Sequence, residues 1–567
     1  MYDAGVRSLA DLADALRSID GAGYGAYKRI KGSWIGDEVE LAIDHVQGDP
    51  FATPSRVRLV LPAAVHAIPG RLRADPTQRT AIADFVLRAF GRAAAAASER
   101  RGSGASGAIF VDVGGAEVLP RSGAGFDDED NLHLRFRVGL PARGRRVLGR
   151  EAAALLTGAL VDAAEAARWS LLDPVAAQAW VRLVQDHAFV QAQLHPRGLV
   201  AFVRDGAVLP RASGVSSRPL RDAVPFASPP SLRVTLPTQF HGDVTGLGLP
   251  RGVTVVTGAG FHGKTTLLEA IAAGIDPHMP GDGREWVVTS PDAVKVRSED
   301  GRSVVGVDLR AFISDLPGGK DTAAFTSEDA SGSTSLAAAI VESVELGASA
   351  LLLDEDTCAT NLLLRDARMQ KLVARETITP LIDRIRGLVD HDGVSTVLVV
   401  GGNGDYLDVA DTVIAMRDYL PHDVTEDAKT IAAQTPTGRE VVARDEGLRV
   451  TARTPDPASF DPRRGRKSKV RARGLREIAF GEQTLDVSAL EQLADDSQAR
   501  AIGALLAWLG RAAVRGNLRA QVRAAVDAAA ASGLYEIDAL PELAGVRHYE
   551  LGAAVNRLRS LRLKTSR

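Results

Sequence analysis

A glycine-rich loop between an apolar run and a helical pattern constrains this sequence most. Residues 253–257 are apolar and β-rich, residues 258–265 read GAGFHGKT, and a helical pattern begins at Thr266. The loop matches G-x-x-x-x-G-K-[ST], in which backbone N–H groups and the positive end of the helix surround a chain of phosphates. We therefore expect a nucleoside triphosphate here; the alternative is a plain glycine-rich turn. The expected phosphate-binding residues share this loop: Gly258, Gly260, Gly263, Lys264, Thr265 and Thr266.

A second apolar run ends in two acids, Asp354 and Glu355. A buried strand of this kind places Asp354 at the edge of a sheet, where it and Thr265 are expected to hold Mg²⁺. Glu355 is expected to polarise the attacking water and Lys264 to reach the outer phosphates, so both are candidate catalytic residues. The alternative is a strand that simply ends in solvated acids.

Three regions differ in their sequence patterns. Up to about residue 205, helical patterns mix with alternating runs such as SRVRLVLP and NLHLRFRVGL, which are typical of strands. Residues 205–230 are rich in Pro, Ser and Gly, which predicts a linker. From 231 to about 447, apolar runs alternate with helical patterns, which predicts a mostly parallel sheet covered by helices. A basic stretch follows, and then an Ala-, Leu- and Arg-rich helical pattern from Ser488.

A Ser-Gly-Ser-Thr run opens an apolar helical pattern between the glycine-rich loop and the acidic pair. Its residues and its spacing from Asp354 resemble the Ser-Gly-Gly-Gln signature of ATP-binding-cassette (ABC) ATPases, with the second Gly and the Gln replaced. The resemblance implies that Ser331, Gly332 and Ser333 bind the γ-phosphate of ATP held by a second copy, in a homodimer that sandwiches the nucleotide. A hydroxyl and free N–H groups at a helix N-terminus suit an anion. The alternative is an ordinary helix cap.

Two further loops resemble the same class but depart from it. Asn361, the last residue of DTCATN, stands where the class has an aspartate that reaches across the dimer interface. The switch histidine of the class is missing, and GGNGD occupies its place. Asn403 is therefore the candidate sensor of the γ-phosphate, or the sensor is absent, which predicts slow hydrolysis. His262 occupies a variable position of the phosphate-binding motif, so it is not expected to act in its stead.

For two contacts of the ABC class, the glutamine loop with Mg²⁺ and an aromatic ring with adenine, the sequence offers only weak candidates. Glu299 lies in the region of the glutamine loop, which senses Mg²⁺ in the class, and a solvated turn residue is the preferred interpretation. Phe240 lies upstream of the glycine-rich loop, where the class often stacks an aromatic ring on adenine. Ordinary core packing is the preferred interpretation for this ring.

Together these motifs resemble one family, the predicted ATPases of the ABC class found in bacteria and some eukaryotic organelles. The similarity extends to LRSIDGAGYGAYKRIKGSW near the N-terminus and RGLREIAFGEQTLDVSALEQL near the C-terminus, so it covers most of the chain. It implies an α/β fold class, with a central ABC-type P-loop ATPase domain between an α+β N-terminal domain and a mainly helical C-terminal domain. It also implies binding of ATP and Mg²⁺, and association of the flanking domains with nucleic acid, RNA in particular. The expected domains are residues 1–205, 206–450 and 451–567.

Basic segments offer separate support for a nucleic-acid partner. Residues 463–476, RRGRKSKVRARGLR, contain eight basic residues and no acid, which suits phosphate neutralisation. In residues 24–34, Tyr24, Tyr27 and Trp34 interleave with three cations, so that the rings would stack on bases. The alternatives are a solvated basic linker for the first segment, and core aromatics beside a solvated basic face for the second. A third cluster, PARGRRVLGR, is expected to form a loop.

Composition narrows the classes of protein to which the chain can belong. The 567 residues carry a net charge of -3 and a single cysteine, Cys358, which excludes an internal disulfide framework. A signal-peptide core and a long uncharged apolar run are both missing, so we expect a cytoplasmic protein without a membrane partner. The leading expectation is an ATP-hydrolysing homodimer that clamps nucleic acid, either RNA or duplex. A slow-turnover clamp, and a regulatory or protein-remodelling ATPase without nucleic acid, remain the alternatives.

Overall fold

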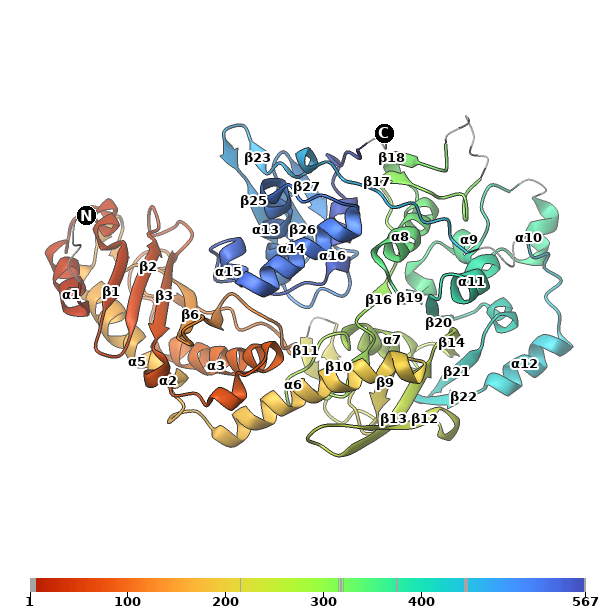
Figure 1. Ribbon diagram of the computed structural model, residues 1–567, viewed down its shortest axis with the longest axis horizontal. Helices are drawn as coiled ribbons and strands as arrows, with labels where there is room; N and C mark the ends of the chain where they lie inside the picture. The colour runs from red at the N-terminus through yellow and green to blue at the C-terminus, as the bar shows by residue number, and fades with distance from the viewer. Residues whose placement is uncertain are drawn as a thin grey trace. The chain divides into compact units, whose positions relative to one another are not determined.

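The chain folds into two compact units. Figure 1 shows the computed structural model, which describes residues 7–214, 216–314, 316, 319, 321–373, 376–442 and 447–564. One unit contains Met1–Gln185 and Ala529–Gly545, and the other contains Asp186–Ala528 and Val546–Arg567. Among the described residues, none of the helices has the length and apolar character needed to span a membrane.

The first unit is built on an antiparallel sheet in the order β1-β2-β3-β6-β4, with β5 paired to β6. Its strands are β1 (Gly32–Ile35), β2 (Glu40–His45), β3 (Ser55–Leu61), β4 (Ile109–Phe110), β5 (Ala124–Phe126) and β6 (Leu132–Val138), with a separate hairpin of β7 (Ala142–Arg143) and β8 (Arg146–Val147). The run SRVRLVL forms β3, and its side chains alternate between buried and partly buried, as the sequence predicts.

Helices accompany this sheet, and α1 and α3 begin at polar caps. They are α1 (Leu9–Ser18), α2 (Ala63–His66), α3 (Pro76–Ala97), α4 (Gly149–Ala154), α5 (Leu160–Ala164), the first part of α6 (Pro174–Leu194) and α15 (Leu534–Ile537). At the start of α3, the Asp75 carboxylate accepts a hydrogen bond from the Gln78 N–H at 2.8 Å, and Pro76 occupies the first helical position. The helix packs on β6 through Phe90 and Phe136, whose ring centroids are 5.2 Å apart. The result is the predicted α+β N-terminal domain.

A six-stranded sheet in the order β16-β19-β20-β14-β21-β22 organises the second unit. Its strands are β14 (Val253–Gly258), β16 (Ala293–Lys295), β19 (Ala350–Asp354), β20 (Ser395–Val399), β21 (Thr412–Arg417) and β22 (Leu420–Asp423). Every neighbouring pair is parallel except β21 and β22. The carboxyl ends of β14, β19 and β20 therefore lie at one edge, where ligands bind to sheets of this kind.

Helix α7 (Lys264–Ala273) is buried between this sheet and an antiparallel one. The second sheet has the order β12-β13-β9-β15, and its strands are β9 (Leu199–Arg204), β12 (Arg233–Pro237), β13 (Asp243–Pro250) and β15 (Val287–Thr289). Leu267 and Ile271 of α7 share one core cluster with Leu247 of β13 and Leu352 of β19. Burial on both sides therefore fixes the helix that follows the glycine-rich loop.

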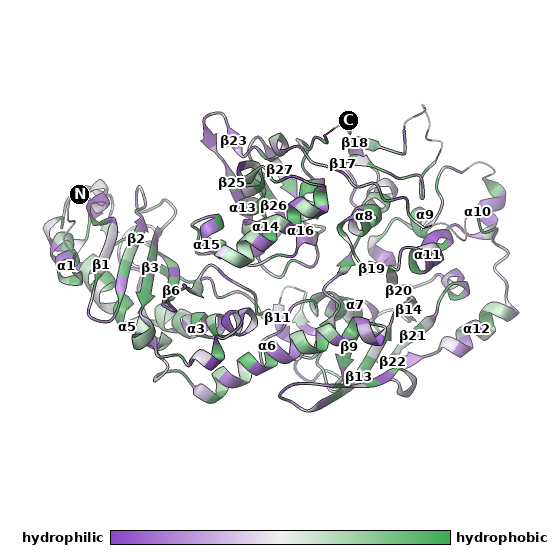
Figure 2. Ribbon diagram, viewed as in Figure 1, coloured by the Kyte–Doolittle hydropathy of each residue, from purple (hydrophilic) through white to green (hydrophobic). Residues whose placement is uncertain are grey.

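Helices and smaller sheets complete the second unit. The hairpin of β17 (Arg302–Val307) and β18 (Phe325–Ala330) leads into α8 (Gly332–Leu346), followed by α9 (Thr360–Leu363), α10 (Ala367–Leu372), α11 (Leu381–Asp390) and α12 (Thr425–Gln434). The C-terminal helices are α13 (Asp496–Ala512), α14 (Leu518–Ser532) and α16 (His548–Asn556). They accompany β23 (Arg463–Arg464), β24 (Lys467–Ser468), β25 (Val470–Arg473), β26 (Glu477–Phe480) and β27 (Gln483–Asp486). Figure 2 shows that the β23 hairpin is hydrophilic.

Candidate functional site

The glycine-rich loop connects the central strand β14 to α7. Gly258 and Gly263 have φ of 136° and 91°, where side chains cause strain, and a Cβ on Gly258 would lie 2.4 Å from the Met416 carbonyl oxygen. The Lys264 ammonium donates to the Gly258 and Ala259 carbonyl oxygens at 2.8 and 2.9 Å. The lysine is therefore folded against the loop that is predicted to hold phosphates.

The predicted metal ligands and the acidic pair meet at this sheet edge. The Thr265 hydroxyl donates to Asp354 Oδ2 at 3.0 Å, and Asp354 is buried at the end of β19. Glu355 Oε2 accepts from the N–H groups of Gly401 and Gly402 at 2.6 and 3.4 Å, in the loop after β20. The hydroxyl and carboxylate oxygens at Thr265 and Asp354 are the donor types that Mg²⁺ prefers, so these residues fit the metal.

The loop that lacks the switch histidine has its own hydrogen bonds. Asn403 Oδ1 accepts from the Asp405 N–H at 3.1 Å and caps the short helix Gly404–Asp408. Within that helix Tyr406 is buried, and its hydroxyl donates to the Leu363 carbonyl oxygen at 2.7 Å. Asn403 thus lies beside the loop that binds Glu355, while its role as a phosphate sensor stays a prediction.

The Ser-Gly-Ser-Thr run begins α8. Ser331 is the N-cap, and its hydroxyl accepts from the Thr334 N–H at 3.4 Å. The Ser333 hydroxyl donates to Asn361 Oδ1 at 2.7 Å, so the structure brings these two candidate residues together. The contacts within the chain are those of a helix cap, and Gly332 follows the cap directly. Binding of a second copy's γ-phosphate by these residues stays a prediction.

A pocket of about 640 Å³ opens beside the glycine-rich loop. The loop lines it with Gly260, Phe261, Gly263, Lys264, Thr265 and Thr266. The outer wall of the pocket comes from the two ends of segment 209–226, and Asp356, Met416 and Tyr419 complete the lining. The lining residues of the segment are Leu209, Pro210, Leu220, Asp222, Ala223, Val224 and Phe226. The composition of residues 205–230 predicts a linker, but they form part of this wall and contain the hairpin of β10 (Arg211–Ser213) and β11 (Ser216–Pro219). Phe240 does not line the pocket; its N–H donates to Asp186 Oδ1 at 3.2 Å.

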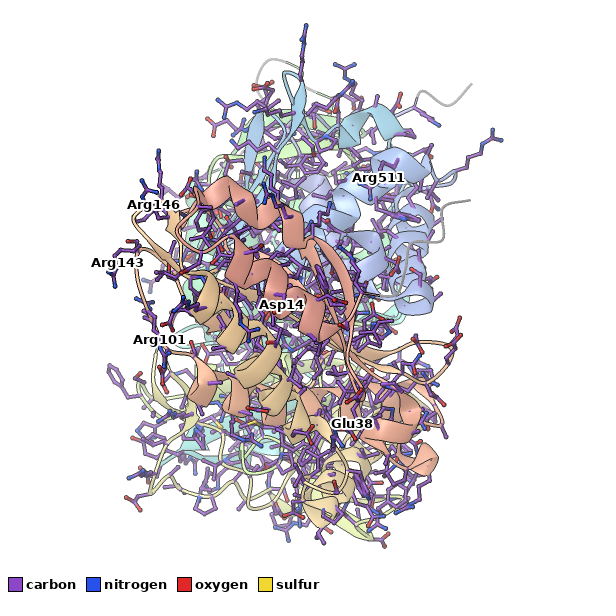
Figure 3. All side chains as sticks on the ribbon, turned by 90° about the vertical axis from the view of Figure 1, so that its left-hand side faces the viewer. Asp14, Glu38, Arg101, Arg143, Arg146 and Arg511 are labelled. Carbon is purple, nitrogen blue, oxygen red and sulfur yellow. The ribbon has the colours of Figure 1, made fainter. Side chains whose placement is uncertain are left out.

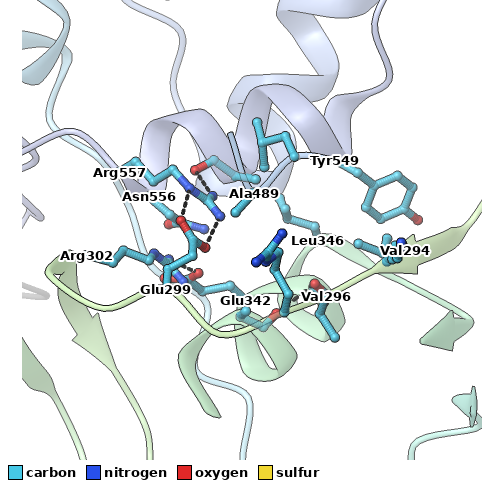
Figure 4. A pocket seen from close by; sticks show the side chains of 16 residues that line it. Val294, Val296, Glu299, Arg302, Glu342, Leu346, Ala489, Tyr549, Asn556 and Arg557 are labelled. Carbon is cyan, nitrogen blue, oxygen red and sulfur yellow. Dashed lines mark hydrogen bonds and ion pairs between the residues drawn. The ribbon is translucent and has the colours of Figure 1, made fainter. Parts of the chain in front are cut away.

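Glu299 connects the start of α8 to the C-terminal part of the second unit. Its N–H donates to the Ser335 hydroxyl at 2.8 Å, and its carboxylate forms an ion pair with Arg557, just beyond α16. Figure 4 shows this pair in a small cavity lined from both elements. The Glu299 side chain is only 15% exposed, so the interpretation as a solvated turn residue is wrong.

The aromatic residues of segment 24–34 belong to the core of the first unit. Tyr24, Tyr27 and Trp34 are buried, and the two phenol groups donate to the carbonyl oxygens of Leu140 and Pro141 at 3.3 and 2.6 Å. The prediction that these rings stack on bases is wrong, because they are enclosed and hydrogen-bonded inside the fold. The alternative, core aromatics beside an exposed basic face, is confirmed.

That basic face is larger than the segment itself. Its exposed cations are Lys28, Arg29 and Lys31, with Arg143, Arg145 and Arg146 from the β7–β8 hairpin. A β-bridge between Gly23 and Arg146 makes the two groups neighbours, and Figure 3 shows Arg143 and Arg146 projecting from the ribbon. The cluster predicted to be a loop is thus a two-stranded hairpin.

Residues 463–476 form strands rather than a linker. The hairpin of β23 and β24 is exposed, and β25 joins a three-stranded sheet with β26 and β27. Some of its cations have acidic partners: Arg463 pairs with Asp461, Arg464 with Glu482 and Arg473 with Glu477. Within the part of the chain that the structure describes, five others have no ion pair: Arg466, Lys467, Lys469, Arg471 and Arg476. We name these five the free cations of the basic segment.

The fold and the site define a class. A parallel sheet whose central strand runs through a glycine-rich loop into a helix, with an acidic pair at the end of a nearby strand, is the arrangement of P-loop nucleoside triphosphatases. Family comparisons agree: residues 174–453 match the P-loop domain of ABC ATPases, and residues 9–170 match the N-terminal domain of ATPases of the ABC class. The chain belongs to this family of ABC-class ATPases. Residues 469–564 match the MRB1590 C-terminal domain, so the P-loop domain is flanked on both sides.

A curated relative gives a more distant comparison. The chain is similar to the uncharacterized protein MJ1628 of Methanocaldococcus jannaschii, with 29% identity over 241 residues. The match covers 41% of this chain and 53% of MJ1628, so it spans about half the length of that relative.

Proposed function

We propose that this chain hydrolyses ATP as a homodimer and uses ATP to control its grip on nucleic acid, RNA in particular. The contact between Thr265 and Asp354, at 3.0 Å, carries the proposal. It joins the end of the glycine-rich loop to the acidic pair, and this combination is needed to hold a metal-bound triphosphate beside a water-activating acid.

In this proposal, different residues have separate roles in hydrolysis. Lys264 leaves the carbonyl oxygens of Gly258 and Ala259 and binds the outer phosphates, because a phosphate anion is the stronger acceptor. Thr265 and Asp354 would hold Mg²⁺, which would neutralise charge that develops on the phosphates. Glu355 accepts a hydrogen bond from the water whose oxygen attacks the γ-phosphorus. The bond from the γ-phosphorus to the bridging oxygen breaks, ADP leaves, and the proton of the water passes to the released phosphate.

A second form of the proposal is a clamp that turns over slowly, and the switch loop favours it. Glu355 already accepts hydrogen bonds from Gly401 and Gly402, so those contacts compete with the attacking water. Asn403 caps its own short helix at the place where the class has a histidine. Both features lower the fraction of time in which the acid and a sensor are ready to act.

The free cations of the basic segment support the nucleic-acid partner. Lys467 and Arg471 lie on strands and the other three lie in the connections between strands; all but Lys469 are exposed. They lack acidic partners within the described chain, so phosphate contacts would cost them no existing ion pair. The exposed cations of segment 24–34 and the β7–β8 hairpin provide a second basic face. Charged side chains of this kind hold the nucleic-acid backbone without reading its sequence.

The enzymatic part of the proposal is tested by measuring nucleotide binding and phosphate release for the wild-type chain, Lys264→Ala and Glu355→Gln. We expect Lys264→Ala to weaken ATP binding, and Glu355→Gln to retain binding while kcat falls by about 10²-fold or more. The amide oxygen that replaces the Glu355 carboxylate still accepts from the Gly401 N–H, so the loop is retained.

The same assay separates the two forms of the proposal. Measurable turnover by the wild-type chain, lost in both variants, supports an ATPase. ATP binding with phosphate release no faster than that of Lys264→Ala indicates a clamp without hydrolysis. Absence of ATP binding by the wild-type chain would contradict both forms.

A further inference from the structure

Exposed apolar side chains gather around the pocket beside the glycine-rich loop. Leu220 and Val224 on its outer wall are 41% and 44% exposed, Tyr419 in the β21–β22 turn is 58% exposed, and Phe261 is 98% exposed. Large apolar groups left in water around a hollow of about 640 Å³ are typical of a small-molecule site. The phosphate-binding function of the loop does not account for them.

The turn that carries Tyr419 is attached to the glycine-rich loop. His262 Nδ1 accepts a hydrogen bond from the Asp418 N–H at 3.0 Å. A Cβ on Gly263 would lie 3.5 Å from the Tyr419 ring, so the ring lies against the last glycine before α7. Tyr419 has a φ of 70°, an uncommon conformation for an aromatic residue that the turn enforces. The ring is therefore placed next to the predicted phosphate site.

The outer wall is also anchored rather than loose. Arg211 forms an ion pair with the buried Asp282 at 2.7 Å, and Arg284 Nε donates to the Leu209 carbonyl oxygen at 2.9 Å. Phe226, at the other end of the wall, is buried. These contacts hold both ends of the wall in place, so the wall is positioned before any ligand enters.

We propose that Leu220, Val224 and Tyr419 bind the base of a purine nucleoside triphosphate whose phosphates occupy the glycine-rich loop. The inference rests on the proposed function, because the phosphates are what place the base. A purine presents a wide flat apolar surface, and the pocket offers an aromatic ring and aliphatic side chains beside the glycine-rich loop. The base site therefore lies on a segment that the sequence assigns to a linker, and Phe240 is not part of it.

Matched substitutions and a ligand without a base test the assignment. ATP and inorganic tripolyphosphate are titrated by calorimetry against the wild-type chain, Tyr419→Ala, Val224→Asp and Tyr419→Phe. We expect the first two variants to raise the Kd for ATP by at least about fivefold, because stacking on the base is lost or the apolar wall is charged. Their Kd for tripolyphosphate stays unchanged, and Tyr419→Phe keeps the affinity for ATP. Phe240→Ala is the control and leaves both constants unchanged.

Each failure has a distinct signature. Wild-type binding of ATP with no change in Tyr419→Ala and Val224→Asp, or a loss of ATP affinity in Phe240→Ala, overturns the base site alone. An equal loss for ATP and tripolyphosphate in the first two variants also overturns it, because the effect is then on the phosphates. Lack of ATP binding by the wild-type chain overturns the proposed function and the base site together.

Discussion

Residues predicted to act on ATP already have partners inside the chain. Lys264 donates to two loop carbonyl oxygens, Thr265 to Asp354, and Ser333 to Asn361. Hydrogen bonds of this kind contribute about 0.5–1.5 kcal/mol each and are exchanged readily for charge-assisted ones. A triphosphate is therefore expected to replace contacts rather than to fill unsatisfied groups.

A buried histidine next to α7 gives the chain a dependence of stability on pH. His187 is buried, its ring nitrogen Nε2 lies 3.2 Å from the Gly274 carbonyl oxygen, and burial lowers its pKa from 6.5 to about 3. Below pH 6.5 the unfolded chain binds a proton that the folded chain does not, so the free energy of unfolding falls with pH. For one group this fall is about 1.4 kcal/mol per pH unit between the two pKa values.

We expect His187→Gln to flatten this dependence. The glutamine amide introduced by this substitution still donates to the Gly274 carbonyl oxygen, but it does not titrate. Urea unfolding of the second unit, measured between pH 6.5 and pH 4.5, reports the slope. His195→Gln makes the same change at an exposed side chain and is the control. Equal slopes in the wild-type chain and His187→Gln would show that His187 is not the titrating group.

At the scale of secondary-structure elements, the sequence predicts those features that depend on residues adjacent in the chain. Strand β14, its glycines and Lys264 form one continuous motif, and the apolar run of β19 ends at Asp354. The pocket wall cannot be predicted in this way. Its Pro-, Ser- and Gly-rich sequence indicates a linker, whereas contacts between residues far apart in the chain, such as the pair of Arg211 with Asp282, show that it is anchored.

Segment 24–34 illustrates the same limit. Aromatic residues between cations have the same pattern whether the rings face a nucleic acid or a protein core. Tyr27 is buried, and its hydroxyl donates a hydrogen bond to the Pro141 carbonyl oxygen, which is distant in sequence. Tertiary contacts decided this assignment, and the fold of the domain followed its alternating strands, such as β3, as predicted.

The strands of the basic segment carry a testable charge effect. We expect the double substitution Lys467→Gln and Arg471→Gln to weaken binding to a labelled RNA oligonucleotide. The slope of log K against log salt should become shallower by about 1.4 for single strands, because two phosphate contacts are lost. Fluorescence anisotropy over a series of NaCl concentrations measures this slope.

Paired cations of the same segment supply the control. Arg463→Gln with Arg473→Gln also removes two charges, but each of these arginines has an acidic partner, Asp461 or Glu477. Their substitution should change the slope by less than the first pair does. An unchanged slope in the variant that lacks Lys467 and Arg471, or a larger change in the control, would show that these cations do not contact the RNA.

At the scale of the whole molecule, the proposed ATP sandwich draws on two separate parts of the chain. The glycine-rich loop lines its pocket with residues 209–226 and Tyr419, whereas Ser331 and its neighbours do not line it. In the proposed homodimer, a second copy would bring its Ser331 to the γ-phosphate. We expect ATP to convert Glu355→Gln from a particle of 59.8 kDa to one of twice that mass.

The cap residue allows this interface to be tested without loss of the helix. Ser331→Asp keeps an N-cap acceptor but adds a negative charge that repels the γ-phosphate, whereas Ser331→Asn keeps the cap without the charge. In the Glu355→Gln background we expect Ser331→Asp to remain monomeric with ATP and Ser331→Asn to dimerise, as measured by light scattering after size exclusion. ATP-dependent dimers of the Ser331→Asp variant would mean that α8 does not face the nucleotide of the second copy.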